Sequence, residues 1–271
     1  MVPLKNQFLS ATNAERNFKL KNYKRINRAA RAGTKKLSAG KALPTSGSEQ
    51  PYNWAPWGKS LIHNVNCYAY ALGSRVKYKN KSVPGNHTGL PPFFSNFKTC
   101  KGLAKRVVGD NPKKVYRVRA TQRCRKGFYK IMMFVAPKND YMDSTGDFHF
   151  YKQHSVVHYK VKKGDSYASI ASFFRIPVSC VQKARTRVDD NKWKFVPKLY
   201  AGKTIKFKAN CFSHKQGWAT GPLLYDADGK MIKDPRKANR NYGYKYTRYC
   251  SSFCVKNKGV DVKPKVSQNI F

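Results

Sequence analysis

Residues 159–174 read YKVKKGDSYASIASFF, a stretch that predicts a change from strand to helix. The preceding strand is expected over residues 157–161, and Gly164 followed by Asp165 predicts a turn. Asp165 is also a candidate helix N-cap, because its carboxylate can accept from unpaired backbone N–H groups. The apolar spacing then predicts a helix whose buried face consists of Tyr167, Ile170, Ala171 and Phe174.

A second helix is expected to start at residues 176–179, with Val181 and Ala184 pointing inward. Residues 186–198 predict a long basic loop, and residues 200–207 a final turn and strand. This strand–helix–helix–strand order over residues 155–208 resembles a LysM module, a small glycan-binding fold. The resemblance implies a glycan site between the first turn and the loop before the last strand, formed by Gly164, Asp165, Ser166, Ile176, Pro177, Leu199, Tyr200 and Ala201.

The residues on either side of this insert are expected to fold together. Residues 66–73, NCYAYALG, predict the first turns of a helix, and residues 97–108 predict another. The expected strands are residues 115–120, 127–136, 147–153, 212–218 and 244–255. Two of them carry a histidine that could serve Cys67: His149 lies in DFHFYKQ and His214 in SHKQG.

A cysteine at a helix start followed by a histidine on a strand resembles the papain-like cysteine hydrolases, including their NlpC-like branch. The motif order also resembles a set of uncharacterised bacterial and large-virus proteins. The resemblance implies that Cys67 is the nucleophile, His149 its base, and His214 the residue that orients the base. The expected fold class is α+β: a papain-like core over residues 51–154 and 209–256, the insert at 155–208, and basic segments at 1–50 and 257–271.

The charge is extreme: 55 Lys and Arg against 13 Asp and Glu give a formal net charge of +42. Self-repulsion of this size favours an anionic partner. The candidates are acidic proteins of a large assembly, nucleic acid, an anionic membrane, and a glycan such as chitin or peptidoglycan. No helix-turn-helix, zinc-finger or RNA-recognition signature accompanies the charge, so a nucleic-acid contact is expected to be with phosphate.

Seven cysteines are an odd number, so at least one is not paired within the chain. Cys100, Cys124, Cys250 and Cys254 could hold zinc, but their spacing favours disulfides or buried thiols, and no metal or cofactor is predicted. Asp226-Ala-Asp228-Gly229 begins like a calcium loop but lacks the later ligands, which predicts a turn. The histidines without a motif are expected mostly on the surface or in loops: His63, His87, His154 and His158.

No signal peptide or membrane-spanning stretch is expected, and residues 13–32 form a candidate helix in the basic arm. Three functions from different classes remain open. The first, which the charge favours over the other two, is a structural component of a large assembly, such as a minor capsid protein of a large DNA virus. The second is an active cysteine peptidase or cell-wall amidase that the insert directs to glycan. The third is a glycan-binding protein with an inactive hydrolase core.

Overall fold

The computed structural model describes residues 38–53, 57–77, 80–90, 100–136, 147–174, 176–188 and 192–265. Most of the basic arm, including the candidate helix at residues 13–32, and the end of the tail lie outside the described residues. The helices are α2 (Lys59–Asn64), α3 (Cys67–Ala71), α4 (Cys100–Asp110), α5 (Tyr167–Phe174) and α6 (Val178–Gln182), with a short 3-10 helix η2 (Pro235–Lys237). The strands are β1 (Ser38–Ala39), β2 (Tyr52–Asn53), β3 (Val115–Val118), β4 (Phe128–Ala136), β5 (Asp147–Lys160), β6 (Arg185–Arg187), β7 (Trp193–Phe195), β8 (Thr204–His214), β9 (Met231–Ile232) and β10 (Arg248–Lys256).

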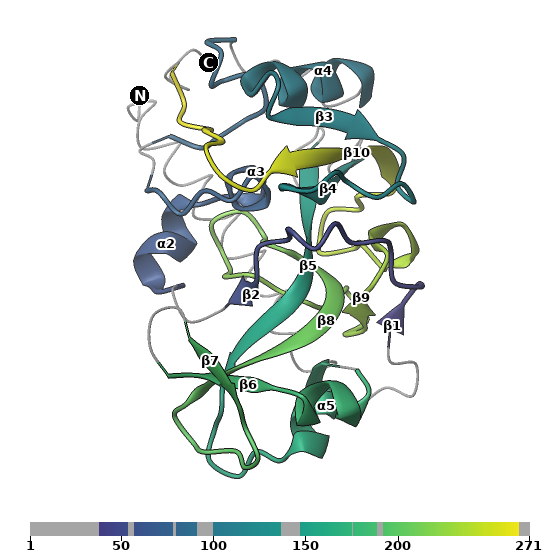
Figure 1. Ribbon diagram of the computed structural model, residues 1–271. Coiled ribbons are helices and arrows are strands. Elements are labelled where there is room, and N and C mark those ends of the chain that lie inside the picture. Colours follow the sequence, from purple (N-terminus) through teal and green to yellow (C-terminus); the bar gives the residue numbers. More distant parts are fainter. Residues whose placement is uncertain are drawn as a thin grey trace, which may run out of the picture.

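These elements form a mixed α+β fold around one large, mostly antiparallel sheet. The sequence correctly predicts the α+β class. Its strand order is β3-β10-β4-β5-β8-β6-β7, and β2 pairs with β5 in the parallel direction. The long strands β5 and β8 run through the middle of the molecule (Figure 1). Helix α4 with β3 and β10 lies at one end, and α5 with β6 and β7 at the other. None of the described helices is both long and apolar enough to cross a membrane.

The central strands are buried on both faces. All nine residues of β4 are buried, which explains its continuous apolar sequence. Alternate side chains such as Met133 and Phe150 join the cluster that contains residues of α3 and α4. The residues between them, such as Phe134 and Tyr151, pack on the other face against the segment that follows β9. Side chains of β4 and β5 are therefore enclosed between two layers.

Two disulfides tie β10 to its surroundings. Cys100 of α4 pairs with Cys250, and Cys124, which lies between β3 and β4, pairs with Cys254. The four cysteines considered for zinc are thus used in pairs, which confirms the preference for disulfides. Cys67, Cys180 and Cys211 are not in disulfides.

Residues 155–208 extend the same sheet rather than forming a separate one. Strand β5 continues to Lys160 and β8 begins at Thr204, so both predicted boundaries fall inside continuous strands. Between them the chain forms α5, α6 and then the hairpin of β6 and β7. The predicted inward side chains are buried at Ile170, Ala171, Phe174, Val181 and Ala184, whereas Tyr167 is partly exposed.

Three local predictions need correction. Part of the expected loop at residues 186–198 is paired: β6 and β7 form a hairpin that hydrogen-bonds to β8. The return strand, expected from residue 212 to 218, instead runs through the insert and ends at His214, because β8 pairs with the whole outer half of β5. The cap of α5 is Ser166: its Oγ accepts from the Ser169 N–H at 3.0 Å, and Ser169 Oγ accepts from the Ser166 N–H at 2.8 Å.

Candidate active site

Cys67 is the first residue of α3, as the sequence predicts. The helix begins there because Asn66, in an extended conformation, accepts a hydrogen bond from the Ala69 N–H through Oδ1 at 3.0 Å. The amide of Asn66 also donates to the Ser82 carbonyl at 2.6 Å, so the cap is anchored to a second segment. Cys67 thus occupies a defined position in the first turn of a short helix.

The thiol of Cys67 lies against the strand that carries His149. Its Sγ donates to the Phe148 carbonyl at 3.8 Å, the carbonyl of the peptide bond that leads into His149. The ring of Tyr246 stacks on His149 at 4.7 Å. Cys67 is 5% exposed and belongs to the buried cluster of Phe148 and Phe150, whereas the His149 ring contacts Tyr151 and His214.

His149 and His214 form a direct pair between β5 and β8. His149 Nε2 lies 2.9 Å from His214 Nδ1, and His214 Nε2 lies 3.0 Å from the Tyr225 carbonyl oxygen. His149 is 2% exposed and His214 is completely buried. The structure therefore brings together two of the predicted site residues and adds a backbone carbonyl that no motif indicated.

The end of this chain of contacts determines which nitrogens carry protons. A carbonyl only accepts, so His214 donates to Tyr225 through Nε2–H. Burial lowers the pKa of His214 to about 4, so at neutral pH its Nδ1 holds a lone pair. His149 must then donate through Nε2–H. A neutral His149 in this tautomer has its lone pair on Nδ1, the atom that a base toward the thiol has to use.

Aromatic rings enclose the histidine pair. Tyr242 stacks on His214 at 4.5 Å, opposite the contact of Tyr246 with His149, and the edge of Tyr151 meets His149 at 5.1 Å. The hydroxyl of Tyr151 donates to that of Tyr242 at 3.1 Å. This environment excludes water, so the hydrogen bond between the two imidazoles is stronger than it would be in solvent.

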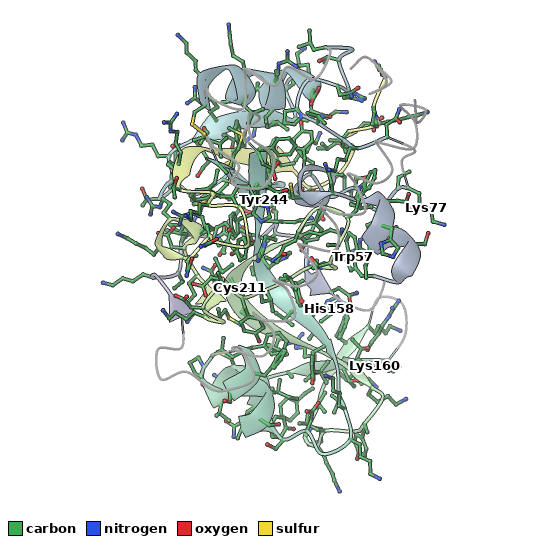
Figure 2. The ribbon with its side chains drawn as sticks, turned by 180° about the vertical axis from the view of Figure 1, so that it is seen from behind. Trp57, Lys77, His158, Lys160, Cys211 and Tyr244 are labelled. Atoms are coloured by element: carbon green, nitrogen blue, oxygen red, sulfur yellow. A yellow bond between two sulfur atoms is a disulfide. The ribbon has the colours of Figure 1, made fainter. Side chains whose placement is uncertain are left out.

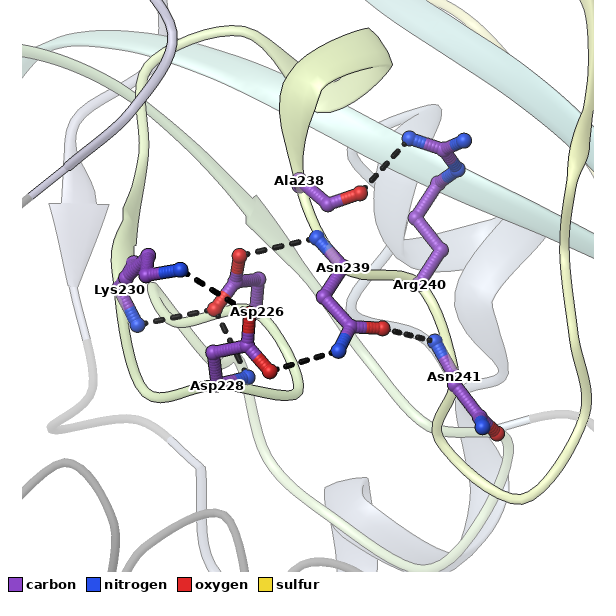
Figure 3. Close-up of polar contacts among 7 residues, drawn as sticks. All are labelled: Asp226, Asp228, Lys230, Ala238, Asn239, Arg240 and Asn241. Atoms are coloured by element: carbon purple, nitrogen blue, oxygen red, sulfur yellow. Dashed lines mark hydrogen bonds and ion pairs between the residues drawn. The ribbon is translucent and has the colours of Figure 1, made fainter.

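The turn that follows Tyr225 is fixed by the side chain of Asp226 (Figure 3). Asp226 Oδ1 accepts from the backbone N–H groups of Asp228 at 3.0 Å and Lys230 at 2.9 Å. Its Oδ2 accepts from the Asn239 N–H at 2.9 Å, which ties the turn to the segment leading to Tyr242. Asp228 binds Lys230 and Asn239, so both carboxylates have protein partners and the predicted turn is confirmed.

A second buried polar cluster was not predicted. His154 was expected on the surface, but residues 50–53 cover this part of β5 and leave it 1% exposed. Its Nδ1 donates to the Gln50 carbonyl at 2.7 Å and its Nε2 accepts from Ser213 Oγ at 2.6 Å, which also contacts the Tyr70 hydroxyl. Lys152 donates to the Gln50 side chain, and burial lowers its pKa to about 7. The alternation of side chains along β5 predicts a buried His154 only when both faces of the strand are known to be covered, and the sequence does not show that.

The residues implied in glycan binding lie around the first turn and the loop before β8. Gly164 has a φ of +83° and open space beside it, whereas Asp165 accepts from the Tyr159 hydroxyl and the Lys162 N–H. Ile176 and Leu199 pack partly into the core of the insert. Pro177 and Ala201 are exposed, like Ser166 of the helix cap. A groove of about 290 Å³ does open on the insert, but Tyr200 is the one residue of the predicted glycan set that lines it.

Comparison of this chain with protein-family models, with curated proteins and with solved structures finds no match.

Proposed function

We propose that this protein is a cysteine hydrolase that cleaves amide bonds, with Cys67 as nucleophile, His149 as general base and His214 as the residue that orients the base. The observation that carries the proposal is the chain of contacts from His149 through His214 to the Tyr225 carbonyl. A neutral His149 in this chain of contacts has its lone pair on Nδ1, and Cys67 lies against the strand residue before His149. A nucleophile, a base and an orienting group are the three parts that thiol catalysis needs.

In this mechanism, His149 Nδ1 takes the proton of Cys67 as the sulfur attacks the substrate carbonyl carbon. The backbone N–H of Cys67 is the candidate donor to the oxyanion. When the tetrahedral intermediate collapses, the carbon–nitrogen bond breaks and His149 passes its proton to the leaving amine. A water molecule, deprotonated by His149, then attacks the thioester and releases the acid and the thiol. His214 accepts from His149 Nε2–H throughout and holds the ring in one orientation.

The same contacts support the finer fold expectation as a proposal. We infer a papain-like or NlpC-like core, in which a cysteine at the start of α3 packs against the strand β5 that carries His149. We infer a LysM-like insert from the outer halves of β5 and β8, which are antiparallel neighbours joined through α5 and α6. Glycan binding by this insert predicts retention on chitin or peptidoglycan at low salt, and full recovery of the protein in the unbound fraction would exclude it.

A second candidate function is favoured by the net charge of +42. Such a chain can act as a basic structural component of a large assembly, such as a virion, where it neutralises acidic proteins or nucleic acid. This function needs no turnover at Cys67. The two candidates therefore differ in one measurable property, the dependence of amide hydrolysis on the thiol.

The experiment compares wild-type protein with Cys67→Ala, His149→Gln and His214→Gln on labelled casein and on purified peptidoglycan peptides. We expect Cys67→Ala to lower the rate at least about 1,000-fold and the two histidine variants to lower it strongly as well. Cys180→Ser, which removes a thiol of α6, is the matched control and should retain activity. Equal hydrolysis by wild type and Cys67→Ala would refute the proposal, and absence of hydrolysis on both substrates would favour the structural candidate.

A further inference from the structure

One face of the sheet in the insert carries a row of cationic and aromatic side chains. The register pairs His158 of β5 with Lys206 of β8, Lys206 with Arg185 of β6, and Arg185 with Phe195 of β7. Directly paired residues of antiparallel strands point to the same face. These four side chains therefore form one line across four strands, on the face that α5 and α6 do not cover.

The helices cover the opposite face. Val157, Ile205 and Phe207, which alternate with the row, are buried in the cluster that contains Ile170 and Phe174. The period of two along each strand thus separates an apolar face toward the helices from a charged face toward solvent. In Figure 2, which looks from behind, the labels of His158 and Lys160 lie along the outer half of β5.

A second row adds to the first. Arg187 pairs with Trp193, two residues along from Arg185 and Phe195 and so on the same face. Lys206 Nζ lies 4.6 Å from the ring centre of Trp193, and the His158 ring lies 4.9 Å from it. Lysines also follow on this face at both ends of the paired strands, at Lys160 and Lys208.

The cations on this face are close enough to act on one another. The pKa of His158 is lowered to about 4, first by burial and then by the charges of Lys206, Arg187 and Arg75. Within the described part of residues 155–208, Asp165 is the one acidic residue, and it is bound in the turn before α5. Among the described side chains of this face, the charged ones are therefore all cations.

Exposed rings accompany this charge. Phe195 is 63% exposed and Tyr200 58% exposed, and both line the groove of about 290 Å³ beside the row. Arg187 and Lys203 also line this groove, and its apolar lining, Val196 and Ile205, belongs to the cluster on the helix side of the sheet. A ligand that is both anionic and planar would use both kinds of group, because phosphates pair with cations and bases stack on exposed rings.

We propose that this face, comprising Arg185, Arg187, Trp193, Phe195 and Lys206 with the adjoining groove at Tyr200, binds single-stranded nucleic acid. The cations meet phosphates, and unstacked bases lie on Phe195 and against Tyr200. A duplex keeps its bases stacked inside and would use the cations alone, whereas single strands use cations and rings together. An acidic peptide would likewise use the charge without needing exposed rings. The inference does not depend on the hydrolase proposal, because it uses none of the same residues.

The test measures anisotropy of a fluorescein-labelled 12-nucleotide oligothymidine with the full-length protein over a range of salt concentrations. Phe195→Ala should weaken binding about 5- to 100-fold, the effect of losing one base stack. Arg185→Ala with Arg187→Ala should also weaken binding and should make the salt dependence less steep by about one to two phosphate contacts. Circular dichroism checks that each variant remains folded, and Cys67 alkylation checks that the core is unchanged.

The matched control is Lys162→Ala with Lys163→Ala, which removes the same charge from the exposed turn before α5. A chain with this net charge binds any polyanion to some extent, so the comparison with the control decides the result. Equal loss in the control and in the Arg185/Arg187 pair, with no effect of Phe195→Ala, would overturn the proposal. It would also be overturned if poly-glutamate bound as tightly and showed the same dependence on Phe195.

Discussion

Strands β5 and β8 each pass through two regions with opposite character. In the inner region, near α3 and β4, they bury polar side chains: His149, Lys152, Gln153, His154, Ser213 and His214. In the outer region, beyond residue 155 of β5 and before residue 209 of β8, buried apolar residues alternate with cations that reach solvent. The same pair of strands therefore serves two different environments along its length.

The difference follows from how many faces are covered. The inner region lies between two packed layers, so every polar side chain there needs a protein partner, and the histidines and Ser213 have one. In the outer region α5 and α6 cover a single face. Apolar side chains on that face alternate with polar ones on the other face, which can therefore carry many charged residues. A chemical site is favoured where burial sets protonation, and a docking face is favoured where side chains remain accessible.

The largest expected effect that tests this comparison is the response to acid. Burial lowers the pKa of His214 to about 4, and burial together with Lys152 lowers that of His154 to about 3. The unfolded chain titrates near pH 6.5, so below that pH it takes up protons that the native state refuses. Each histidine should then cost about 1.4 kcal/mol of unfolding free energy per pH unit, until its own folded-state pKa is reached.

Urea denaturation at pH 7 and pH 5 measures this effect. A variant with His154→Gln and His214→Gln should lose most of the slope, whatever its stability at pH 7. His158→Gln is the matched control in the outer region. The pKa of His158 is also lowered to about 4, mainly by burial, but the ring is partly exposed and solvent screens it. His158→Gln should therefore remove less of the pH slope than the double variant. A slope that the double variant leaves unchanged would contradict the assignment of neutral buried histidines.

An intermediate effect is expected from two adjacent phenylalanines of α5. Phe174 is 1% exposed and packs on Phe207 and Tyr159, so Phe174→Ala should cost about 3–5 kcal/mol. Phe173 is 50% exposed, so Phe173→Ala should cost about 1 kcal/mol or less. Hydrogen exchange should show that Phe174→Ala weakens protection of α5 and α6 while β4 and β10 keep theirs. Equal loss of protection in both regions would mean that they unfold as one unit.

The smallest effect concerns the cap of α5. Ser166→Ala removes the hydroxyl that accepts from the Ser169 N–H and should cost about 1 kcal/mol. Ser172→Ala, at an exposed position inside the same helix, should change stability by no more than about 0.5 kcal/mol. Differential scanning calorimetry of the two variants separates the cap from the general effect of replacing serine. Equal melting temperatures of the two variants would show that Ser166 does not cap the helix and that another residue of the turn does.

Local patterns were sufficient for much of the insert. The spacing of Ile170, Ala171 and Phe174 predicted a buried helical face, and α5 has one, because helical periodicity is a property of neighbouring residues. The start of α3 at Cys67 was also predicted, since a capping asparagine acts over three residues. The hairpin of β6 and β7 was missed because its stabilising partner is β8, which adds hydrogen bonds from a distant segment.

For the candidate site, sequence alone determined the chemical types: a thiol at a helix start, and histidines on two strands. The tertiary structure decided their relation, because the register of β5 against β8 places His149 beside His214, and the Asp226 turn places a carbonyl on the far ring nitrogen. It also buried His154, which no motif had marked. Protonation depends on burial and on partners far apart in the chain, and neither is encoded in local spacing.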